Sequence, residues 1–404
     1  MNKYYSAILA AGSTQLFWYL SIPVLTRIYS PSEIGLYGLF TALTAFISLG
    51  ISARSDIAIL GSDGKYIKEI FSAHNKLGVY IIIPISFVLI ASVIKFDWPV
   101  KSVLLCIVIL FSSYVSYIYS LCGIVLIKNE GYVILKKTAL TRSLVQLILQ
   151  LIMFAWGGIG LILGKILADI LILKKRLNCI KIYKVNWNIK FNEQEKNILL
   201  LNKHKYGYAI PQKIINSVSQ MLPMFFVSTR STGEELGFYT IAFMLAVAPI
   251  GLLGTPIHQI LYRDFSNSNG SASNIKNLVK KTISLIGFSV IIYATTHLIG
   301  ERIIIQILGQ EWSQVFEIMM LLLVWSLAGL VSQPSLAFLL SLSRHKEHLI
   351  YEIIVFVGRV LTLNYGFTNI KIIDNLYIFI IWNFISLIAF TVWIFWLAMD
   401  KRND

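Results

Sequence analysis

Residues 21–60 read SIPVLTRIYSPSEIGLYGLFTALTAFISLGISARSDIAIL, and the part from Ile34 to Leu60 decides the fold class. No charged residue interrupts the stretch from Ile34 to Ala53. A helix of this length crosses the hydrocarbon core of a bilayer, which is roughly 30 Å thick. Because similar apolar runs recur along the whole chain, the sequence predicts an all-α integral membrane protein.

The composition of the full chain of 404 residues is also that of a membrane protein. Hydrophobic residues make up 56% and charged residues 14%, with a mean hydropathy of +0.72, whereas soluble domains have about 45–50% apolar and about 25% charged residues. About twelve transmembrane helices are expected. They lie near residues 5–28, 34–60, 76–96, 102–127, 135–156, 158–173, 207–228, 236–261, 279–299, 315–341, 349–367 and 375–399. The loops are too short for a soluble catalytic domain, an ATPase or a nucleic-acid-binding module.

Lysine and arginine orient these spans. With the amino terminus inside, the segments predicted to face the cytoplasm hold 24 of the 35 basic residues, and the outer segments hold six. Cytoplasmic loops of membrane proteins carry such an excess. The sequence therefore predicts that both termini are cytoplasmic, and the net charge of +15 reflects topology first.

The longest polar segment lies at the middle of the chain. We expect an N-terminal six-helix bundle in residues 1–175, a basic cytoplasmic connecting loop in 176–206 and a C-terminal six-helix bundle in 207–404. The motif EIGLY at Glu33–Tyr37 recurs as ELGFY at Glu235–Tyr239, each time after a proline. With six spans in each half, this repeat predicts two halves related by a pseudo-two-fold axis along the membrane normal.

Five basic residues fall inside the predicted spans, where a cation on an isolated helix costs about 2.5–3.5 kcal/mol. They are Arg54, Arg142, Lys165, Lys213 and Arg359. The candidate acids within the spans are Asp56 and Asp169, and Asp169 follows Lys165 by four residues, which favours a pair on one helix. The remaining positive charge suits an anionic head group that enters from the cytoplasm. The alternative is snorkelling of the long side chains to the interface.

Uncharged polar residues indicate a wet interior. One helical face of the seventh span is polar, which is unfavourable toward lipid. That face carries Gln212, Asn216, Ser219 and Gln220. The candidates for lining a polar cavity are Gln15, Gln146, Gln150, Gln212, Asn216 and Gln220. Hydrogen bonding between helices without transport is the alternative role.

Several other motifs predict no chemistry. Gly160, Gly164 and Lys165 resemble a phosphate-binding loop only superficially, and Gly160-x-x-x-Gly164 favours close helix packing. The six histidines show no metal spacing, and no pair of acids stands in a long outer loop, as a glycan polymerase would need. We therefore expect no catalytic residue, no metal and no cofactor.

The stretch from Ser21 to Leu60 resembles the polysaccharide biosynthesis family of membrane exporters, and in particular Wzx-type flippases of O-antigen or capsule repeat units. This family belongs to the superfamily that includes multidrug and toxin extrusion transporters. Similarity continues in Leu222–Tyr262, with Gly237-Phe238-Tyr239, Pro249 and His258-Gln259, and in Leu308–Trp312.

The resemblance implies two six-helix bundles around a central cavity, working by alternating access. The expected substrate is an undecaprenyl-diphosphate-linked oligosaccharide, moved from the cytoplasmic to the periplasmic leaflet of a bacterial inner membrane. Cations line the cavity in this family at positions that vary, so the role is carried over to the five buried cations only as a group. If an ion is coupled, Asp56 or Asp169 is expected to bind it. The bilayer, a glycan polymerase and a chain-length regulator are the other expected partners.

Three other functions remain open from the sequence. An ion-coupled drug exporter on the same fold would need buried acids in excess of cations. A membrane-embedded glycan polymerase or acyltransferase would need long outer loops and paired acids or histidines. A purely structural membrane subunit would leave five buried cations unexplained. The prediction is therefore a transporter and not an enzyme.

Overall fold

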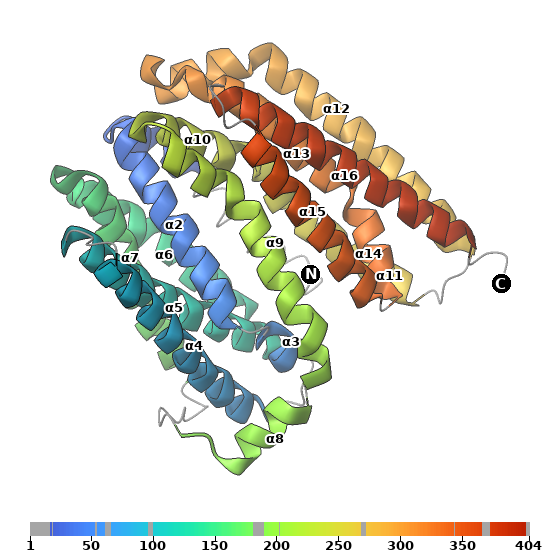
Figure 1. Ribbon diagram of the computed structural model, residues 1–404, viewed down its shortest axis with the longest axis horizontal. Helices are drawn as coiled ribbons and strands as arrows, with labels where there is room; N and C mark the ends of the chain where they lie inside the picture. The colour runs from blue at the N-terminus through green and yellow to red at the C-terminus, as the bar shows by residue number, and fades with distance from the viewer. Residues whose placement is uncertain are drawn as a thin grey trace. The chain divides into compact units, whose positions relative to one another are not determined.

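The computed structural model describes residues 17, 19–52, 55–60, 66–95, 100–180, 190–201, 203–267, 272–342, 344–365 and 372–400. Within these ranges the chain is helical and contains no strand (Figure 1). The predicted all-α fold class is confirmed for this part of the chain.

The helices form two compact units. Unit 1 lies within Met1–Phe17 and Tyr37–Val218, and unit 2 lies within Trp18–Leu36 and Ser219–Asp404. The elements of unit 1 are α3 (Ser55–Leu60), α4 (Ile67–Lys95), α5 (Val100–Lys128), α6 (Tyr132–Ile152), η2 (Phe154–Trp156), α7 (Gly157–Cys179) and α8 (Glu193–Leu201). Those of unit 2 are α10 (Gly233–Ala246), η3 (Ile250–Gly254), α11 (Thr255–Asn267), α12 (Ala272–Leu308), η4 (Gln310–Trp312), α13 (Gln314–Val331), α14 (Gln333–Ser341), α15 (His345–Tyr365) and α16 (Ile372–Asp400). Two helices, α2 (Pro31–Ser52) and α9 (Lys203–Arg230), have residues in both units.

Eight helical segments among the described residues are long and apolar enough to cross a membrane. Helices α6, α9 and α15 are outside this set, since each carries several charged residues. They hold Arg142, Lys213 and Arg359, so three of the five candidate cations lie on the least apolar long helices. The count of twelve spans and the cytoplasmic position of the termini stay predictions.

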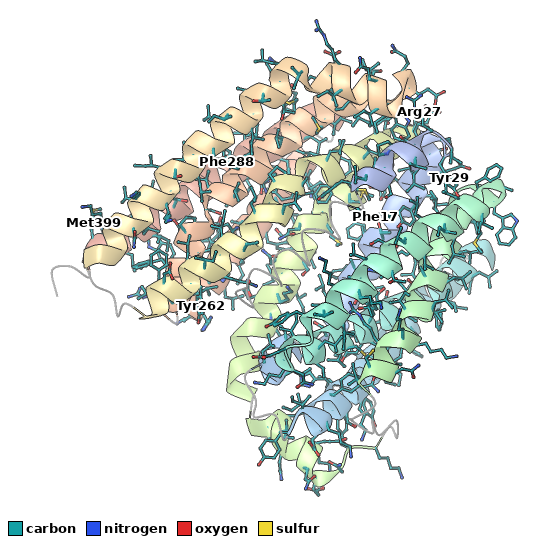
Figure 2. All side chains as sticks on the ribbon, turned by 180° about the vertical axis from the view of Figure 1, so that it is seen from behind. Phe17, Arg27, Tyr29, Tyr262, Phe288 and Met399 are labelled. Carbon is teal, nitrogen blue, oxygen red and sulfur yellow. The ribbon has the colours of Figure 1, made fainter. Side chains whose placement is uncertain are left out.

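Helix α12 presents an apolar surface outward. Figure 2 shows Phe288 on this helix, and Ile283, Val290 and Ile291 beside it are also exposed. Lipid tails solvate such a surface, whereas soluble monomers rarely expose a large one. With 37 residues and a rise of 1.5 Å per residue, α12 is about 55 Å long, more than enough to span the hydrocarbon core. The protein is therefore a multi-pass membrane protein.

Several expected spans differ in detail from the structure. The span expected near 315–341 is divided into α13 and α14 immediately before Pro334, since proline lacks an N–H and disrupts a helix interior. The span expected near 236–261 contains α10, the π-helical turn η3 after Pro249, and α11. The span expected near 158–173 is longer, because α7 continues to Cys179.

Unit 1 has its core where α4 and α5 pack together. Tyr117 and Phe71 are almost completely buried in it. The Tyr117 hydroxyl donates a hydrogen bond of 2.7 Å to the carbonyl oxygen of His74. A Cβ atom on Gly78 would lie 2.7 Å from the Tyr117 ring, so this glycine permits the close approach of the two helices.

Unit 2 is tied together by the sequence Leu308–Trp312 at the end of α12. Gly309 has a φ of 108°, a left-handed conformation that glycine adopts without steric cost. The turn buries Trp312, whose indole N–H donates to the carbonyl oxygen of Thr26 at 3.2 Å. Arg27 donates to two carbonyl oxygens in the last turn of α12, at 2.8 and 3.3 Å (Figure 2). This cation also complements the helix dipole, so α12 is fixed to the segment that precedes α2.

The two copies of the repeated motif meet within unit 2. A Cβ atom on Gly35 would lie 2.7 Å from the carbonyl oxygen of Gly233, and one on Gly237 would overlap the carbonyl oxygen of Pro31. The same offset of 202 residues relates Gly35 to Gly237 and Pro31 to Gly233. Such a reciprocal contact is the pattern that a two-fold axis produces.

Both copies also begin their helix in the same way. The Glu33 carboxylate accepts from the backbone N–H of Ser30 at 2.8 Å, and the Glu235 carboxylate accepts from that of Thr232 at 2.9 Å. These are the backward hydrogen bonds of a capping box, which satisfies N–H groups left over at a helix start. The internal repeat is therefore present in local structure as well as in sequence.

We predict that Gly237→Ala destabilises the protein, because the methyl group forces α10 and the start of α2 apart. Overpacking of this kind costs about 1–3 kcal/mol. Thermal unfolding in detergent measures the effect. Gly287→Ala is the matched control, since a Cβ atom there meets nothing within 4 Å, and its unfolding temperature should not fall. Equal stability of the two variants would contradict the close contact.

Helix α8 is fixed to α4 by a buried ion pair. The Lys76 ammonium donates to both carboxylate oxygens of Glu195 at 2.9 and 2.7 Å, and the two side chains are 2% and 1% exposed. The Glu195 backbone N–H donates to Asn192, and Glu195 accepts in return from the Asn192 N–H. The ring of Phe191 stacks on Tyr80. Part of the predicted connecting loop is thus a helix held against unit 1.

We predict that this attachment weakens in acid. Burial disfavours the charged Glu195, but hydrogen bonds from Lys76, Ser72 and Asn192 outweigh it and lower the Glu195 pKa below its usual 4.5. A lowered pKa in the folded state means that the stabilisation is present above the unfolded pKa and is lost as the pH falls through the folded pKa, below 4.5. A spin label at the exposed position Gln194 should become mobile only in that range.

Two substitutions check the cause of this mobility. Glu195→Gln should make the label mobile already at pH 7, whereas Glu193→Gln should not, because Glu193 is exposed and pairs only with exposed Lys196. If the spin label at position 194 is as immobile in the Glu195→Gln variant as in the parent protein, the ion pair does not hold α8.

Candidate functional site

A row of polar residues on α6 faces α7 in unit 1. The row consists of Thr138, Arg142, Gln146 and Gln150, spaced four residues apart and thus on one helical face. The helices approach closely at Gly164, where a Cβ atom would lie 2.8 Å from Gln150, and at Gly160, where it would overlap the carbonyl oxygen of Met153. The predicted packing role of Gly160-x-x-x-Gly164 is confirmed.

One buried carboxylate organises this interface. Asp169 is 1% exposed and accepts from Arg142 Nε at 2.5 Å and from Lys165 Nζ at 2.9 Å. The hydroxyl of Ser116 lies 3.3 Å from the same carboxylate. The expected pair of Lys165 and Asp169 on one helix is confirmed, and Arg142 joins it from α6. Two of the five candidate cations are therefore brought together.

The two glutamines of the row join helices. Gln146 donates to the hydroxyl of Tyr37 on α2, and Gln150 donates to the carbonyl oxygen of Leu161 on α7, both at 3.0 Å. Both side chains are buried. These bonds account for polar atoms that would otherwise be costly inside a membrane protein. Contact of either glutamine with a substrate stays a prediction.

Arg176 is a further cation of this interface that the sequence does not predict as a site residue. The sequence places it in the connecting loop, but it lies on α7 and is 3% exposed. Its Nε donates to the Thr138 hydroxyl at 3.0 Å, and its Nη1 donates to the carbonyl oxygen of Tyr119 at 2.9 Å. The spacing of Lys165, Asp169 and Arg176 places all three on one side of α7 and was the available signal.

The charges of this interface do not balance. Helices α5, α6 and α7 carry nine basic residues and a single acid, Asp169. Arg142 and Lys165 contact that acid, and Arg176 lies near Arg142, since both guanidinium groups lie over the ring of Tyr119. Among the described residues no second carboxylate forms an ion pair with them. The site therefore has a net positive charge that is available to an anion.

Unit 2 contains a buried cation of its own. Arg359 on α15 is 6% exposed and donates to Asn383 at 2.6 Å and to the hydroxyl of Ser219 at 2.7 Å. Its guanidinium lies over the rings of Trp325 and Phe379, at 5.4 and 5.9 Å from their centroids. Within the described part of the chain, no carboxylate pairs with it. Neutral dipoles and π-systems contact this charge, and the buried carboxylate of Glu352 on the same helix, which pairs with His348, also attracts it.

The other predicted site residues have different environments. Lys213, Gln212 and Asn216 on α9 are half-buried, Gln220 is exposed, and Asp56 on α3 is half-buried. Arg54 and Gln15 lie outside the described residues. The predicted polar face of α9 reaches a candidate cation through Ser219, which binds Arg359.

The site consists of groups that can bind an anion. Among the described residues no group of three or more His, Cys, Asp or Glu side chains could hold a metal ion. The charged groups of the site are guanidinium and ammonium donors around one carboxylate that is already occupied. Such donors recognise phosphate and carboxylate groups.

We predict that Asp169→Asn destabilises the protein by about 3 kcal/mol, because it leaves the buried Lys165 and the half-buried Arg142 without their partner. Thermal unfolding in detergent measures this. The double change Asp169→Asn/Lys165→Met should recover part of the loss, since one orphan cation is removed. Glu193→Gln is the control carboxylate and should cost below about 1 kcal/mol. A wild-type unfolding temperature for Asp169→Asn would contradict the account of this site.

The sequence of this chain matches the model of a known protein family. A family model described as polysaccharide biosynthesis protein matches residues 24–317, well over half of the chain. No curated protein matches the chain significantly.

Comparison with solved structures gives a fold. Lipid II flippase MurJ in an inward closed conformation is similar with a TM-score of 0.72 at 15% identity, over 95% of this chain and 86% of that chain. An inward-facing structure of a multidrug resistance MATE family transporter of the MOP superfamily has a TM-score of 0.64 at 13% identity, over 99% of this chain and 95% of that one. An outward-facing structure has a TM-score of 0.64 at 15% identity, over 98% and 96%. At these identities the likeness establishes a shared fold.

Proposed function

Because this chain belongs to the polysaccharide biosynthesis protein family, we propose that it is a flippase for lipid-linked oligosaccharides. Its substrate would be an undecaprenyl-diphosphate-linked repeat unit. The protein would move this unit from the cytoplasmic to the periplasmic leaflet of a bacterial inner membrane, for O-antigen or capsular polysaccharide. The shared fold with a lipid II flippase is consistent with a lipid-linked cargo.

The excess of cations over acids at the interface of α5, α6 and α7 is the observation that carries the proposal. Arg142 and Lys165 share the single carboxylate of Asp169, and in unit 2 the hydrogen bonds of the Arg359 side chain go to the neutral side chains of Asn383 and Ser219. A charge in hydrocarbon is costly, and an anionic ligand reduces that cost by pairing with it. A diphosphate provides the needed charge and the oxygen acceptors that arginine binds with two parallel hydrogen bonds.

The three parts of the substrate need three environments. The diphosphate docks on cations, for which Arg54 and Lys213 complete the set of candidates. The sugars contact polar side chains such as Gln212, Asn216 and Gln220, and the polyprenyl tail stays in lipid. Access alternates between the two sides of the membrane, as in other transporters built from internal repeats. No bond is made or broken, so the protein would not be an enzyme.

An ion-coupled drug exporter is the second candidate, and the fold shared with MATE family transporters favours it. Asp169 or Asp56 would then bind the coupling ion. The contacts of Asp169 count against this role, because two cations already occupy both of its carboxylate oxygens. The surplus of buried positive charge also repels an organic cation.

We predict that this protein restores surface polysaccharide in a host that lacks its own repeat-unit flippase, tested over a panel of hosts with different glycans. Arg359→Gln and Arg142→Gln should lower the surface polysaccharide at least tenfold at equal membrane levels, since each removes a cation from the interior. Lys137→Gln and Lys174→Gln are controls that remove one exposed charge each and should stay within twofold of the parent.

Two results would contradict the proposal. Full rescue by every cation variant would show that these side chains do not bind the cargo. Failure of the parent in all hosts, together with efflux of an organic cation from the same cells, would replace the flippase by a drug exporter.

A further inference from the structure

A cavity of about 400 Å³ opens between α5, α6 and α7 of unit 1. Arg142 and Arg176 form its basic side, Tyr119 and Ser120 line it from α5, and Ile124 and Ile127 form its apolar side. Its volume is in the range of about 300–1,000 Å³ that is typical of small-ligand sites. We propose that this cavity binds the phosphate group of an anionic lipid. The inference goes beyond the proposed function, since such binding does not require transport.

The two arginines are held in place by one aromatic ring. The guanidinium of Arg176 lies 3.5 Å and that of Arg142 lies 4.8 Å from the centroid of the Tyr119 ring. Arg176 is further fixed by its bonds to Thr138 and to the carbonyl oxygen of Tyr119. Because these contacts already order its long side chain, binding a ligand costs little additional conformational entropy.

The arginines retain donors for a ligand. A guanidinium has five N–H groups, and the bonds of Arg176 engage Nε and Nη1. In the described part of the chain, no carboxylate pairs with Arg176, while Arg142 uses Nε for Asp169. Two converging guanidinium groups match the oxygens of a phosphate, to which arginine binds in bidentate geometry.

The position of the cavity favours a lipid. It lies toward the end of unit 1 where α5 finishes, α6 begins and α7 finishes, and this end carries Lys128, Lys136, Lys137, Lys174 and Lys175. The positive-inside rule assigns this end to the cytoplasm, where the leaflet surface is negatively charged. The exposed Ile127 beside the arginines provides contact for an acyl or prenyl chain.

Lipid phosphate has two sources here. One is an anionic phospholipid of the cytoplasmic leaflet, and the other is the diphosphate head group of a polyprenyl-linked glycan. Both present the same phosphate oxygens to Arg142 and Arg176. The probes are therefore short-chain phosphatidylglycerol, a short-chain polyprenyl diphosphate and inorganic pyrophosphate, with short-chain phosphatidylcholine as the zwitterionic control.

The test is a binding titration of the purified full-length protein in detergent. The parent should bind phosphatidylglycerol or the polyprenyl diphosphate saturably and at least tenfold more tightly than phosphatidylcholine. Arg176→Gln should weaken that binding at least tenfold. Lys137→Gln, which removes an exposed charge from the same end, should change it less than twofold.

A second variant separates binding from folding. Ser120→Phe keeps every cation and places a ring in the cavity from the exposed position 120, so it should also weaken binding at least tenfold. If Arg176→Gln does not fold, Ser120→Phe decides the outcome alone. Absence of saturable binding to the parent, or binding to Ser120→Phe equal to that of the parent, would overturn the proposal.

The probe that binds identifies the source of the phosphate. Tight binding of phosphatidylglycerol assigns the cavity to leaflet phospholipid, tight binding of polyprenyl diphosphate assigns it to the cargo, and equal binding of pyrophosphate shows recognition of the phosphate alone. All three support the site. This titration measures binding and not transport. If the protein binds an anionic lipid but does not restore surface polysaccharide in any host, the proposed function is contradicted and the phosphate site is still supported.

Discussion

The carboxylate of Asp169 is the interaction on which unit 1 depends. It is the only acid on α5, α6 and α7, and it pairs with Arg142 from one helix and Lys165 from another. In a membrane interior either cation would be costly without such a partner, and the pairing joins α6 to α7 where Gly160 and Gly164 bring them close. One carboxylate cannot balance three cations. The leftover positive charge, together with that of Arg176, is the charge that we propose binds an anion.

The sequences that identify the family have structural roles in this protein. Trp312 fixes the end of α12 to the segment before α2, and Gly35 and Gly237 let the two repeated helices touch. The cations that would bind a cargo lie elsewhere, on the polar helices α6, α9 and α15 and on α7. The structural residues and the candidate cargo-binding residues of this protein are therefore different sets.

The sequence predicted features that depend on the local spacing of residues or on the preference of apolar runs for the membrane. Apolar runs gave the helical membrane class, and a spacing of four residues gave the pair of Lys165 with Asp169. It did not predict contacts between distant segments. The basic run at the end of α7 resembles a loop, yet packing against Thr138 and Tyr119 buries Arg176. Lys76 and Glu195 are 119 residues apart, and only the folded chain brings them together. The number of spans and the contacts of the site residues with cargo stay predictions.

The central claim is that buried cations carry an anionic lipid-linked cargo across the membrane. The most direct test is transfer of a fluorescent polyprenyl-diphosphate-linked glycan between the leaflets of proteoliposomes, compared for the parent, Arg359→Gln and protein-free vesicles. The account predicts that the parent transfers the glycan and that Arg359→Gln is at least tenfold slower. Transfer by Arg359→Gln at the parent rate, or no transfer above protein-free vesicles by the parent, would contradict it.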